Sequence, residues 1–384
     1  MPTTKAKNLF YRVCLPLMAP PVGKDPIHRV NGHPLLRQSD FVRLLKKHHI
    51  QGSATLLTDR DSSCLILTHS PLSGHHAEEN TYFRVASITK VATALVAMIH
   101  CDRGLLNLDS PIAEVFPVGH VIPPMEKITL RHLLSHTAGI SDPPQLENEL
   151  LQEKTVDTIL ADCIFSEPGK QFRYSNLGFG LIGCMMEAVC RSPVSEIFQE
   201  TLFSPLGMEA TLDGSRLDPE RIMPVSRIFP WRHQELKITP LGKAPLSSPD
   251  PLRHYGHTAG SLYITVDSLY RMMTVLRDGN PDLISESSRE AMFREHASYG
   301  ALSPTLSYGL GLLFIHDRSL SSSRIVGHQG FAYGCADGAF FEEKTGRMMI
   351  TLNGGCSEAR TGRLGLSNRD FLRFAFQKEL PLWS

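Results

Sequence analysis

The stretch FRVASITK, residues 83–90, places a serine and a lysine three positions apart at the start of an apolar run. Apolar residues recur at helical spacing from residue 87 to residue 101, and Gly104 follows where a helix would end. Ser87 and Lys90 therefore share one face of the predicted helix, so the ammonium group can reach the hydroxyl. A neutral lysine could then accept the serine proton as the serine attacks a carbonyl carbon. Because this spacing also arises by chance in a serine-rich chain, further residues must support that chemistry.

A second group of residues suited to catalysis follows a Pro-Gly turn at residues 168 and 169. There the tripeptide YSN, residues 174–176, begins a predicted helix. A tyrosine close to a lysine can act as a shared general acid and base, because nearby positive charge lowers its pKa from about 10. Tyr174 is the candidate for that role, and Asn176 could bind a substrate amide or hold the lysine.

A third tripeptide, HQG at residues 328–330, stands at the end of a strand predicted over residues 323–328. Gly330 would let a substrate lie close to this strand, beside His328. The next backbone N–H group, that of Phe331, could pair with the N–H of Ser87 to form an oxyanion hole. These residues are therefore candidates for substrate binding.

Strand patterns occur near both ends of the chain, and helical patterns occupy the middle. The predicted strands cover residues 53–58, 63–68, 310–315, 323–328, 338–342 and 348–352. The predicted helices cover residues 129–136, 177–190, 264–277 and 368–379, with an earlier helix that has Ser39 as its N-cap.

Strands from both ends around a helical middle predict an α/β (α+β) fold, in which one antiparallel sheet flanked by helices stands beside a helical lobe. We expect residues 1–35 to form an N-terminal extension and residues 36–384 to form one domain. Its sheet lobe would comprise 36–86 and 305–384, and its helical lobe 87–304. A cleft between the lobes is the natural ligand site.

The chain resembles the serine β-lactamase-like family, which includes class C β-lactamases, penicillin-binding DD-peptidases, D-aminopeptidases and family VIII esterases. FRVASITK carries the resemblance together with ITLRHLLSHTAG at 128–139, PGKQFRYSN at 168–176 and AGSLYITVD at 259–267. These motifs come in the order and spacing of the family, from about residue 40 to the C-terminus. The resemblance implies the β-lactamase/transpeptidase-like fold.

The resemblance also implies roles for particular residues. Ser87 would be the nucleophile, Lys90 a base or the partner of a base, and Tyr174 a proton relay. Asn176 would contact the substrate, and the acyl-enzyme oxygen would lie between the amides of Ser87 and Phe331. Whether Lys90 or Tyr174 deprotonates the serine stays open, because the two groups would titrate as a coupled pair.

The sequence departs from the family at its third motif, which is KTG in β-lactamases and most penicillin-binding proteins. A KTG at residues 344–346 lies in a polar turn, and HYG at 254–256 lacks a preceding strand, so HQG is the better match. His328 is mostly neutral at pH 7, and Gln329 lacks the hydroxyl that helps bind a β-lactam carboxylate. These changes predict poor activity on penicillins and a preference for neutral esters or amides.

These observations favour hydrolysis of a small-molecule ester or amide by a serine hydrolase. The same acyl-enzyme could pass its acyl group to an alcohol or amine, as in an acyltransferase. A D-amino-acid peptidase, a β-lactamase and a non-catalytic scaffold are further alternatives. No cofactor is predicted, and no metal either, since His132 and His136 have zinc-like spacing but no evident third ligand.

Composition limits the partners and the location. The 39 basic and 39 acidic residues balance, which argues against nucleic acid as a partner. No run of 18 apolar residues and no cleavable signal pattern is found, so neither a membrane partner nor secretion is expected. Eight scattered cysteines fit a reducing compartment, and a cytoplasmic location is predicted. The oligomeric state stays open.

Overall fold

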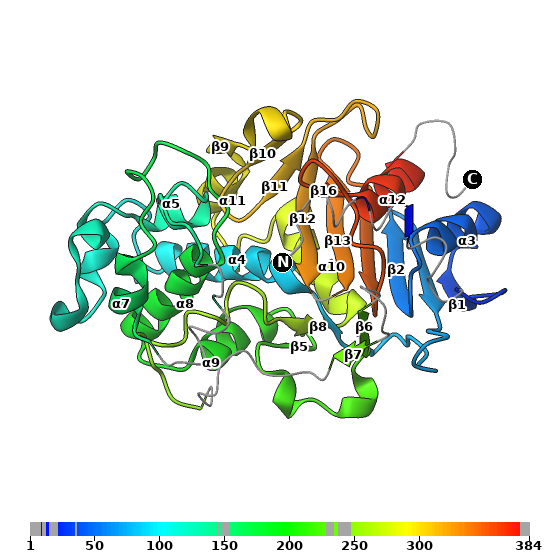
Figure 1. The fold of residues 1–384 in the computed structure, drawn as a ribbon, viewed down its shortest axis with the longest axis horizontal. Helices are drawn as coiled ribbons and strands as arrows, with labels where there is room; N and C mark the ends of the chain where they lie inside the picture. The colour runs from blue at the N-terminus through cyan, green and yellow to red at the C-terminus, as the bar shows by residue number, and fades with distance from the viewer. Residues whose placement is uncertain are drawn as a thin grey trace.

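The computed structural model describes residues 22–34, 37–143, 154–227, 234–236, 247–332 and 334–376, with residues 9, 13, 14 and 146. Within this part of the chain, nine strands form one antiparallel sheet in the order β1-β3-β2-β14-β13-β12-β11-β10-β9 (Figure 1). Strands from the two ends of the chain meet where β2 pairs with β14, which confirms the predicted antiparallel sheet. The strands are β1 Ile27–Gly32, β2 Ser53–Thr58, β3 Ser63–Thr68, β9 Ala297–Ser298, β10 Leu306–Tyr308, β11 Leu313–Ile315, β12 Ile325–Ala332, β13 Cys335–Glu342 and β14 Met348–Asn353.

Helices cover both faces of this sheet and also form a separate group beside it (Figure 1). The α-helices longer than one turn are α3 Gln38–Lys47, α4 Thr89–Asp102, α5 Leu130–Leu134, α7 Val156–Ala161, α8 Asn176–Cys190, α9 Val194–Phe198, α10 Val266–Asp278, α11 Glu286–Phe293 and α12 Leu366–Phe376. Helix α10 contacts one face, through β2, β13 and β14, and α12 contacts β13 and β14 and packs with α3. The group formed by α5, α7, α8 and α9 lies on the left of Figure 1.

The apolar pattern of the central strands explains this layered arrangement. In β14, Met348 and Ile350 join the core that also contains α10 and α4, whereas Met349 joins the core of α3 and α12. Successive side chains of a strand point to opposite faces, so a continuous apolar run requires cover on both sides. The sheet is therefore the middle layer between two helical layers.

A small sheet brings the first motif next to the stretch 259–267. Its strands are β4 Phe83–Arg84, β8 Tyr263–Ile264 and β5 Ala210–Thr211, in the order β4-β8-β5. The described residues also contain two two-stranded antiparallel sheets. One pairs β6 Val225–Arg227 with β7 Gln234–Leu236, and the other pairs β15 Arg360–Thr361 with β16 Leu364–Gly365.

The structure corrects several predicted boundaries. The first helix begins at Gln38 with Arg37 as its N-cap, so Ser39 lies inside it. The strand predicted over 310–315 begins only at Leu313, because residues 309–312 form the turn between β10 and β11, where the N–H of Gly309 donates to the carbonyl of Leu312. HQG lies inside β12 and not at its end, because β12 stays paired with β13 as far as Ala332.

Two further differences concern the ends of the sheet lobe. Strand β1 lies within the segment expected to be an extension, and it pairs with β3 as an edge strand of the large sheet. Strand β9 and helix α10 come from the stretch assigned to the helical lobe, yet both belong to the sheet and its cover. The closing helix is described as far as Phe376, so residues 377–379 of its predicted range lie outside the described residues.

No single helix in the described ranges is long and apolar enough to span a membrane, although the bent pair Asn176–Cys190 and Val194–Phe203 passes that test by length and composition together. None of the eight cysteines forms a disulfide.

Candidate active site

Ser87 lies in a short 3-10 turn, η2 (Ala86–Ile88), immediately before helix α4. The preceding residue, Ala86, adopts a left-handed backbone with φ of 46°, an uncommon conformation for a residue with a side chain. The turn is held from both sides, because the hydroxyl of Thr89 donates to the Ala86 carbonyl over 2.6 Å and accepts the N–H of Leu262 over 3.1 Å. The stretch 259–264 therefore fixes the position of the serine.

Lys90 is completely buried beneath Ser87. Its ammonium nitrogen, Nζ, donates to the Ser87 Oγ over 3.2 Å, to the Asn176 Oδ1 over 2.8 Å and to the carbonyl oxygen of Ala259 over 2.8 Å. Burial lowers the pKa of Lys90 to about 7, against a smaller opposite effect from the carboxylate of Asp142. A substantial fraction of Lys90 is consequently neutral near pH 7.

Tyr174 lies close to both Ser87 and Lys90. Its side chain hydrogen-bonds the Ser87 side chain, and its ring centroid is 4.8 Å from the Lys90 Nζ. The pKa of Tyr174 is nevertheless raised, because loss of solvent around the phenol outweighs the Ser87 hydrogen bond. This corrects the expectation that the lysine would lower it, so Tyr174 is a protonated hydroxyl near neutral pH.

His328 lies on β12 with both ring nitrogens occupied. Nδ1 is 2.7 Å from the carbonyl oxygen of Gln329, and Nε2 is 2.9 Å from the hydroxyl of Tyr308. Since the carbonyl can only accept, Nδ1 carries the proton and Nε2 accepts from the tyrosine. Burial, aided by Lys90, lowers the pKa of His328 to about 3. The imidazole is thus neutral, as expected, and it stays neutral well below pH 7.

The close approach of β12 to the nucleophile depends on Gly330. A Cβ atom added at Gly330 would collide with the carbonyl oxygen of Val85, two residues before Ser87. Absence of a side chain therefore brings the strand against η2. The following residue, Phe331, lines the same cavity as Ser87.

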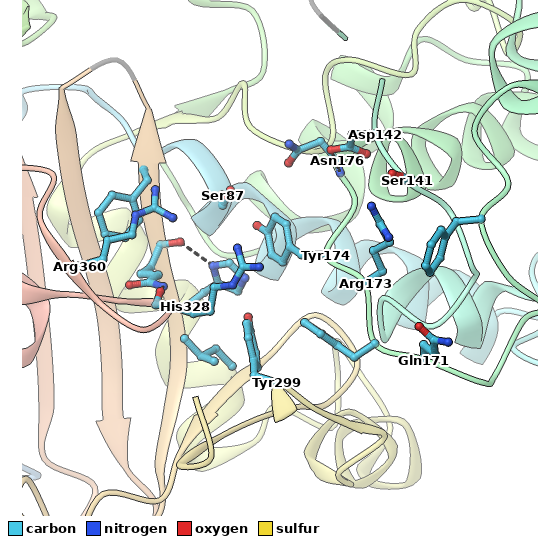
Figure 2. Close-up of a pocket in the computed structure, with 16 residues that line it drawn as sticks. Ser87, Ser141, Asp142, Gln171, Arg173, Tyr174, Asn176, Tyr299, His328 and Arg360 are labelled. Carbon is cyan, nitrogen blue, oxygen red and sulfur yellow. Dashed lines mark hydrogen bonds between the residues drawn. The ribbon is translucent and has the colours of Figure 1, made fainter. Parts of the chain in front are cut away.

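One cavity of about 700 Å³ collects most of the predicted residues. Ser87, Tyr174, Asn176, His328 and Phe331 line it (Figure 2). Lys90 is bonded to the lining residues Ser87 and Asn176, and Gly330 packs against the backbone of Val85. The structure thus brings together every candidate residue of the sequence analysis. The lining also includes polar and charged residues that the sequence analysis did not single out: Ser141, Asp142, Gln171, Arg173, Tyr299, Arg360 and Arg363.

Asp142 is the most connected of these additional residues. Its carboxylate accepts from the hydroxyl of Ser175 over 2.7 Å and from the backbone N–H groups of Asn176 and Leu177 over 2.8 and 3.0 Å. It therefore caps the N-terminus of α8, where negative charge is favourable. In the sequence, Asp142 lies three residues after HTAG (136–139), and this position was the only indication of a role.

Asp142→Asn is expected to change both stability and pH dependence. Loss of the charged cap should lower the free energy of unfolding by about 1 kcal/mol. The Asp142 carboxylate raises the pKa of Lys90, so its removal should move that pKa further down. The rising limb of kcat/KM against pH would then shift to lower pH. Thermal unfolding and a pH profile measure the two effects, and an unchanged or upward-shifted limb would contradict the electrostatic part.

The two histidines with zinc-like spacing have structural partners. Nδ1 of His132 accepts the N–H of Thr129, and Nδ1 of His136 accepts the N–H of Ser175, each over 3.2 Å. The ring of His136 also stacks under Tyr174 with centroids 4.2 Å apart. Across the described ranges, no three His, Cys, Asp or Glu side chains are grouped so that they could hold a metal ion.

Both alternative third motifs lie outside the cavity lining. The KTG stretch, 344–346, forms the turn between β13 and β14, where the hydroxyl of Thr345 donates to Glu342 over 2.6 Å. His254 is buried against the carboxylate of Glu187, with Nδ1 2.8 Å from Oε1. The assignment of KTG to a hairpin turn is confirmed.

Comparison with known proteins agrees with this geometry. The chain is 25% identical over 318 residues to penicillin-binding protein 4* of Bacillus subtilis, covering 76% of this chain and 65% of that protein. It is 26% identical over 342 residues to esterase EstB of Burkholderia gladioli, covering 78% and 83%. The solved structure of EstCE1, described as a hydrolase with promiscuous acyltransferase activity, superposes with a TM-score of 0.69 at 20% identity, covering 88% and 97%.

The chain thus spans just under two thirds of the length of penicillin-binding protein 4* and most of the length of EstB. The structural likeness confirms the β-lactamase/transpeptidase-like fold. The family model named Beta-lactamase matches residues 38–354, a range that contains all the candidate residues of the sequence analysis and leaves out Arg360 and Arg363 of the cavity lining. The chain therefore belongs to the Beta-lactamase family.

Proposed function

We propose that the protein is a serine hydrolase that cleaves an ester or amide of a small molecule through an acyl-enzyme on Ser87. One observation carries this proposal: the buried Lys90 ammonium, with its pKa lowered to about 7, lies 3.2 Å from the Ser87 Oγ. A lysine that loses its proton near neutral pH is a suitable general base. The presence of a named esterase among the relatives supports the same class of reaction.

In the first step, neutral Lys90 accepts the proton of the Ser87 hydroxyl while the Oγ bonds to the substrate carbonyl carbon. The developing oxyanion lies between the backbone N–H groups of Ser87 and Phe331. Collapse of this intermediate breaks the bond to the alcohol or amine. The protonated Tyr174, bonded to the Ser87 side chain, donates a proton to that leaving group and recovers one from Lys90.

In the second step, water attacks the acyl carbon and transfers its proton back through Tyr174 or Lys90, which releases the acid and restores the serine. Asn176 holds the Lys90 ammonium through its Oδ1 and reaches the cavity. Asn176 therefore holds the Lys90 Nζ in place during both acylation and deacylation.

Intact-mass measurement of acyl adducts tests this proposal. The wild-type protein and Ser87→Ala are each mixed with p-nitrophenyl esters, D-aminoacyl amides and nitrocefin, and labelled in parallel with a fluorophosphonate. We expect adducts and label on the wild type and none on Ser87→Ala. Added alcohol or amine reports acyl transfer, because the product would then carry the acyl group. Absence of both adduct and label on the wild type would favour a scaffold.

The pH dependence of acylation follows from the pKa of Lys90. Because the lysine must be neutral to accept a proton, kcat/KM should rise with pH and level off above an inflection near 7. His328 contributes no inflection in this range, since its pKa is lowered to about 3. Steady-state rates between pH 5 and pH 9 on a neutral ester measure the profile. A profile that falls through pH 7 would contradict Lys90 as the base.

A further inference from the structure

One of the three hydrogen bonds of Lys90 goes to a segment that lies outside the helices and strands. Its Nζ donates to the carbonyl oxygen of Ala259 over 2.8 Å, and Ala259 belongs to residues 250–259, which we call the turn segment. The other two acceptors, on Ser87 and Asn176, are placed by η2 and by the start of α8. A carbonyl group outside regular structure has no ladder to fix its direction, so other contacts must aim it at the lysine.

Helix α8 lies directly against the turn segment. Gly180, Gly183 and Glu187 recur along α8 at spacings of three and four residues, so they share one face of the helix. A Cβ atom added at Gly180 would lie 1.7 Å from the carbonyl oxygen of Tyr255, and one at Gly183 would lie 2.7 Å from the hydroxyl oxygen of Thr258. The two glycines therefore allow the backbone of the turn segment to approach the helix closely.

A buried carboxylate on the same face anchors the start of the turn segment. Glu187 accepts from the Nδ1 of His254 over 2.8 Å and from the backbone N–H groups of Asp250 and Val194, each over 2.7 Å. Both side chains of the Glu187–His254 pair are buried. Because separating a buried carboxylate from its donors is costly, the start of the segment cannot drift along α8.

Thr258 fixes the other end of the turn segment between two helices. Its hydroxyl donates to the carbonyl oxygen of Phe179 on α8 over 2.8 Å. Its own carbonyl oxygen accepts from the hydroxyl of Thr93, three residues after Lys90 on α4, over 2.7 Å. Both threonines are completely buried. Since Thr258 immediately precedes Ala259, these two bonds set the direction of the carbonyl group that accepts from Lys90.

The charged and titratable groups near Lys90 come mainly from other segments. The carboxylate of Asp142 acts to raise the pKa of Lys90. Three buried rings that are neutral near pH 7 also lie nearby: Tyr174, His136 and His328. Within the turn segment, burial lowers the pKa of His257 to about 4, and His254 is bonded to the anchoring carboxylate. The direct contact of the turn segment with the ammonium group is therefore the neutral carbonyl of Ala259.

We propose that Thr258 and Thr93 are positioning residues for the general base, because together they aim the carbonyl group of Ala259 at the Lys90 ammonium and keep its nitrogen next to the Ser87 hydroxyl. A carbonyl that accepts from the charged lysine favours the protonated form, so its aim also sets the pH at which the base becomes available. This inference rests on the proposed hydrolase function. Neither threonine lines the cavity, and both act through Lys90.

Thr258→Val and Thr93→Val test the proposal from the two helices separately. Valine keeps the shape of threonine but lacks the hydroxyl donor. The second-order rate of fluorophosphonate labelling of Ser87 is measured between pH 5 and pH 9, which requires no natural substrate. We expect each variant to label about tenfold more slowly on the plateau, because the base is misplaced. The rising limb should move to lower pH by about 0.5 to 1, because a misaimed carbonyl stabilises the ammonium less.

Two further variants separate positioning from packing. Thr258→Ser restores the hydroxyl and should return both the plateau and the limb close to the wild-type values. Thr68→Val in β3 removes a buried hydroxyl that is bonded to Ser53, and it should lower the thermal midpoint without moving the limb. Circular dichroism shows whether each variant is folded. If Thr258→Val does not fold, Thr93→Val decides, because it releases the same segment from α4.

Failure of this inference is distinct from failure of the hydrolase proposal. Folded valine variants with the wild-type plateau and limb, or with a limb moved to higher pH, would overturn the positioning role even where the thermal midpoint falls. Label on the wild-type Ser87 would leave the hydrolase standing in that case. A wild-type labelling rate that does not change with pH would overturn the positioning role too, because Lys90 would not be the base. Absence of label on the wild type would overturn both proposals.

Discussion

Lys90→Met is expected to lower the rate of acylation of Ser87 by a factor on the order of 10⁴. Methionine fills a similar volume but removes the group that accepts the serine proton over 3.2 Å. Tyr174 cannot replace it as a base, because burial raises the pKa of its phenol further above neutrality. Pre-steady-state release of p-nitrophenol from a neutral ester measures the acylation rate, and intact mass measures the adduct.

Lys90→Arg separates proton transfer from charge. Arginine keeps a positive charge but does not lose its proton in proteins, so it should be nearly as inactive as methionine. Lys127→Met, at an exposed lysine paired with Glu167, is the matched control and should acylate at the wild-type rate. Circular dichroism shows whether each variant is folded. A folded Lys90→Arg protein that acylates rapidly would mean that the ammonium acts only through its charge.

The sequence predicted those features that short segments determine by themselves. Helical spacing put Ser87 and Lys90 on one face, and the strand predicted over residues 348–352 lies within β14. The YSN tripeptide was placed at a helix start, and α8 begins there with Ser175 as its N-cap. Such features depend on local periodicity and capping, which can be read without knowledge of the fold.

The remaining features depend on contacts between distant segments. The pKa of Tyr174 is set by burial beneath residues from other parts of the chain, so lysine proximity alone gave the wrong direction. Arg360 and Arg363 lie on the hairpin 360–365, whose strands have two residues each and show no periodicity. Its bonds to Gln329 and the contact of Arg360 with the Phe331 ring hold it beside β12. The sequence comparison indicated only that Gln329 lacks a hydroxyl, and it did not predict the bonds of Gln329 to the hairpin.

Gly330→Ala is expected to lower kcat/KM by about 10²- to 10³-fold, an effect second only to that of Lys90→Met. Its Cβ would collide with the backbone carbonyl of Val85, which is not a flexible group, so β12 must move away from η2. Displacement of the Phe331 N–H weakens one of the two proposed oxyanion donors, and loss of one such donor costs a factor of this size. Crowding should also lower the free energy of unfolding by about 1–3 kcal/mol.

Gly119→Ala is the matched control, because a Cβ at that position meets no atom within 4 Å. It should keep wild-type kinetics and stability, whereas Gly330→Ala should lose kcat on a neutral ester at saturating concentration. The loss belongs in kcat because an oxyanion donor binds the transition state more tightly than the ground state. If Gly330→Ala changes only the thermal midpoint and not kcat, β12 contributes packing against η2 but no oxyanion donor, and the catalytic amide must come from another segment.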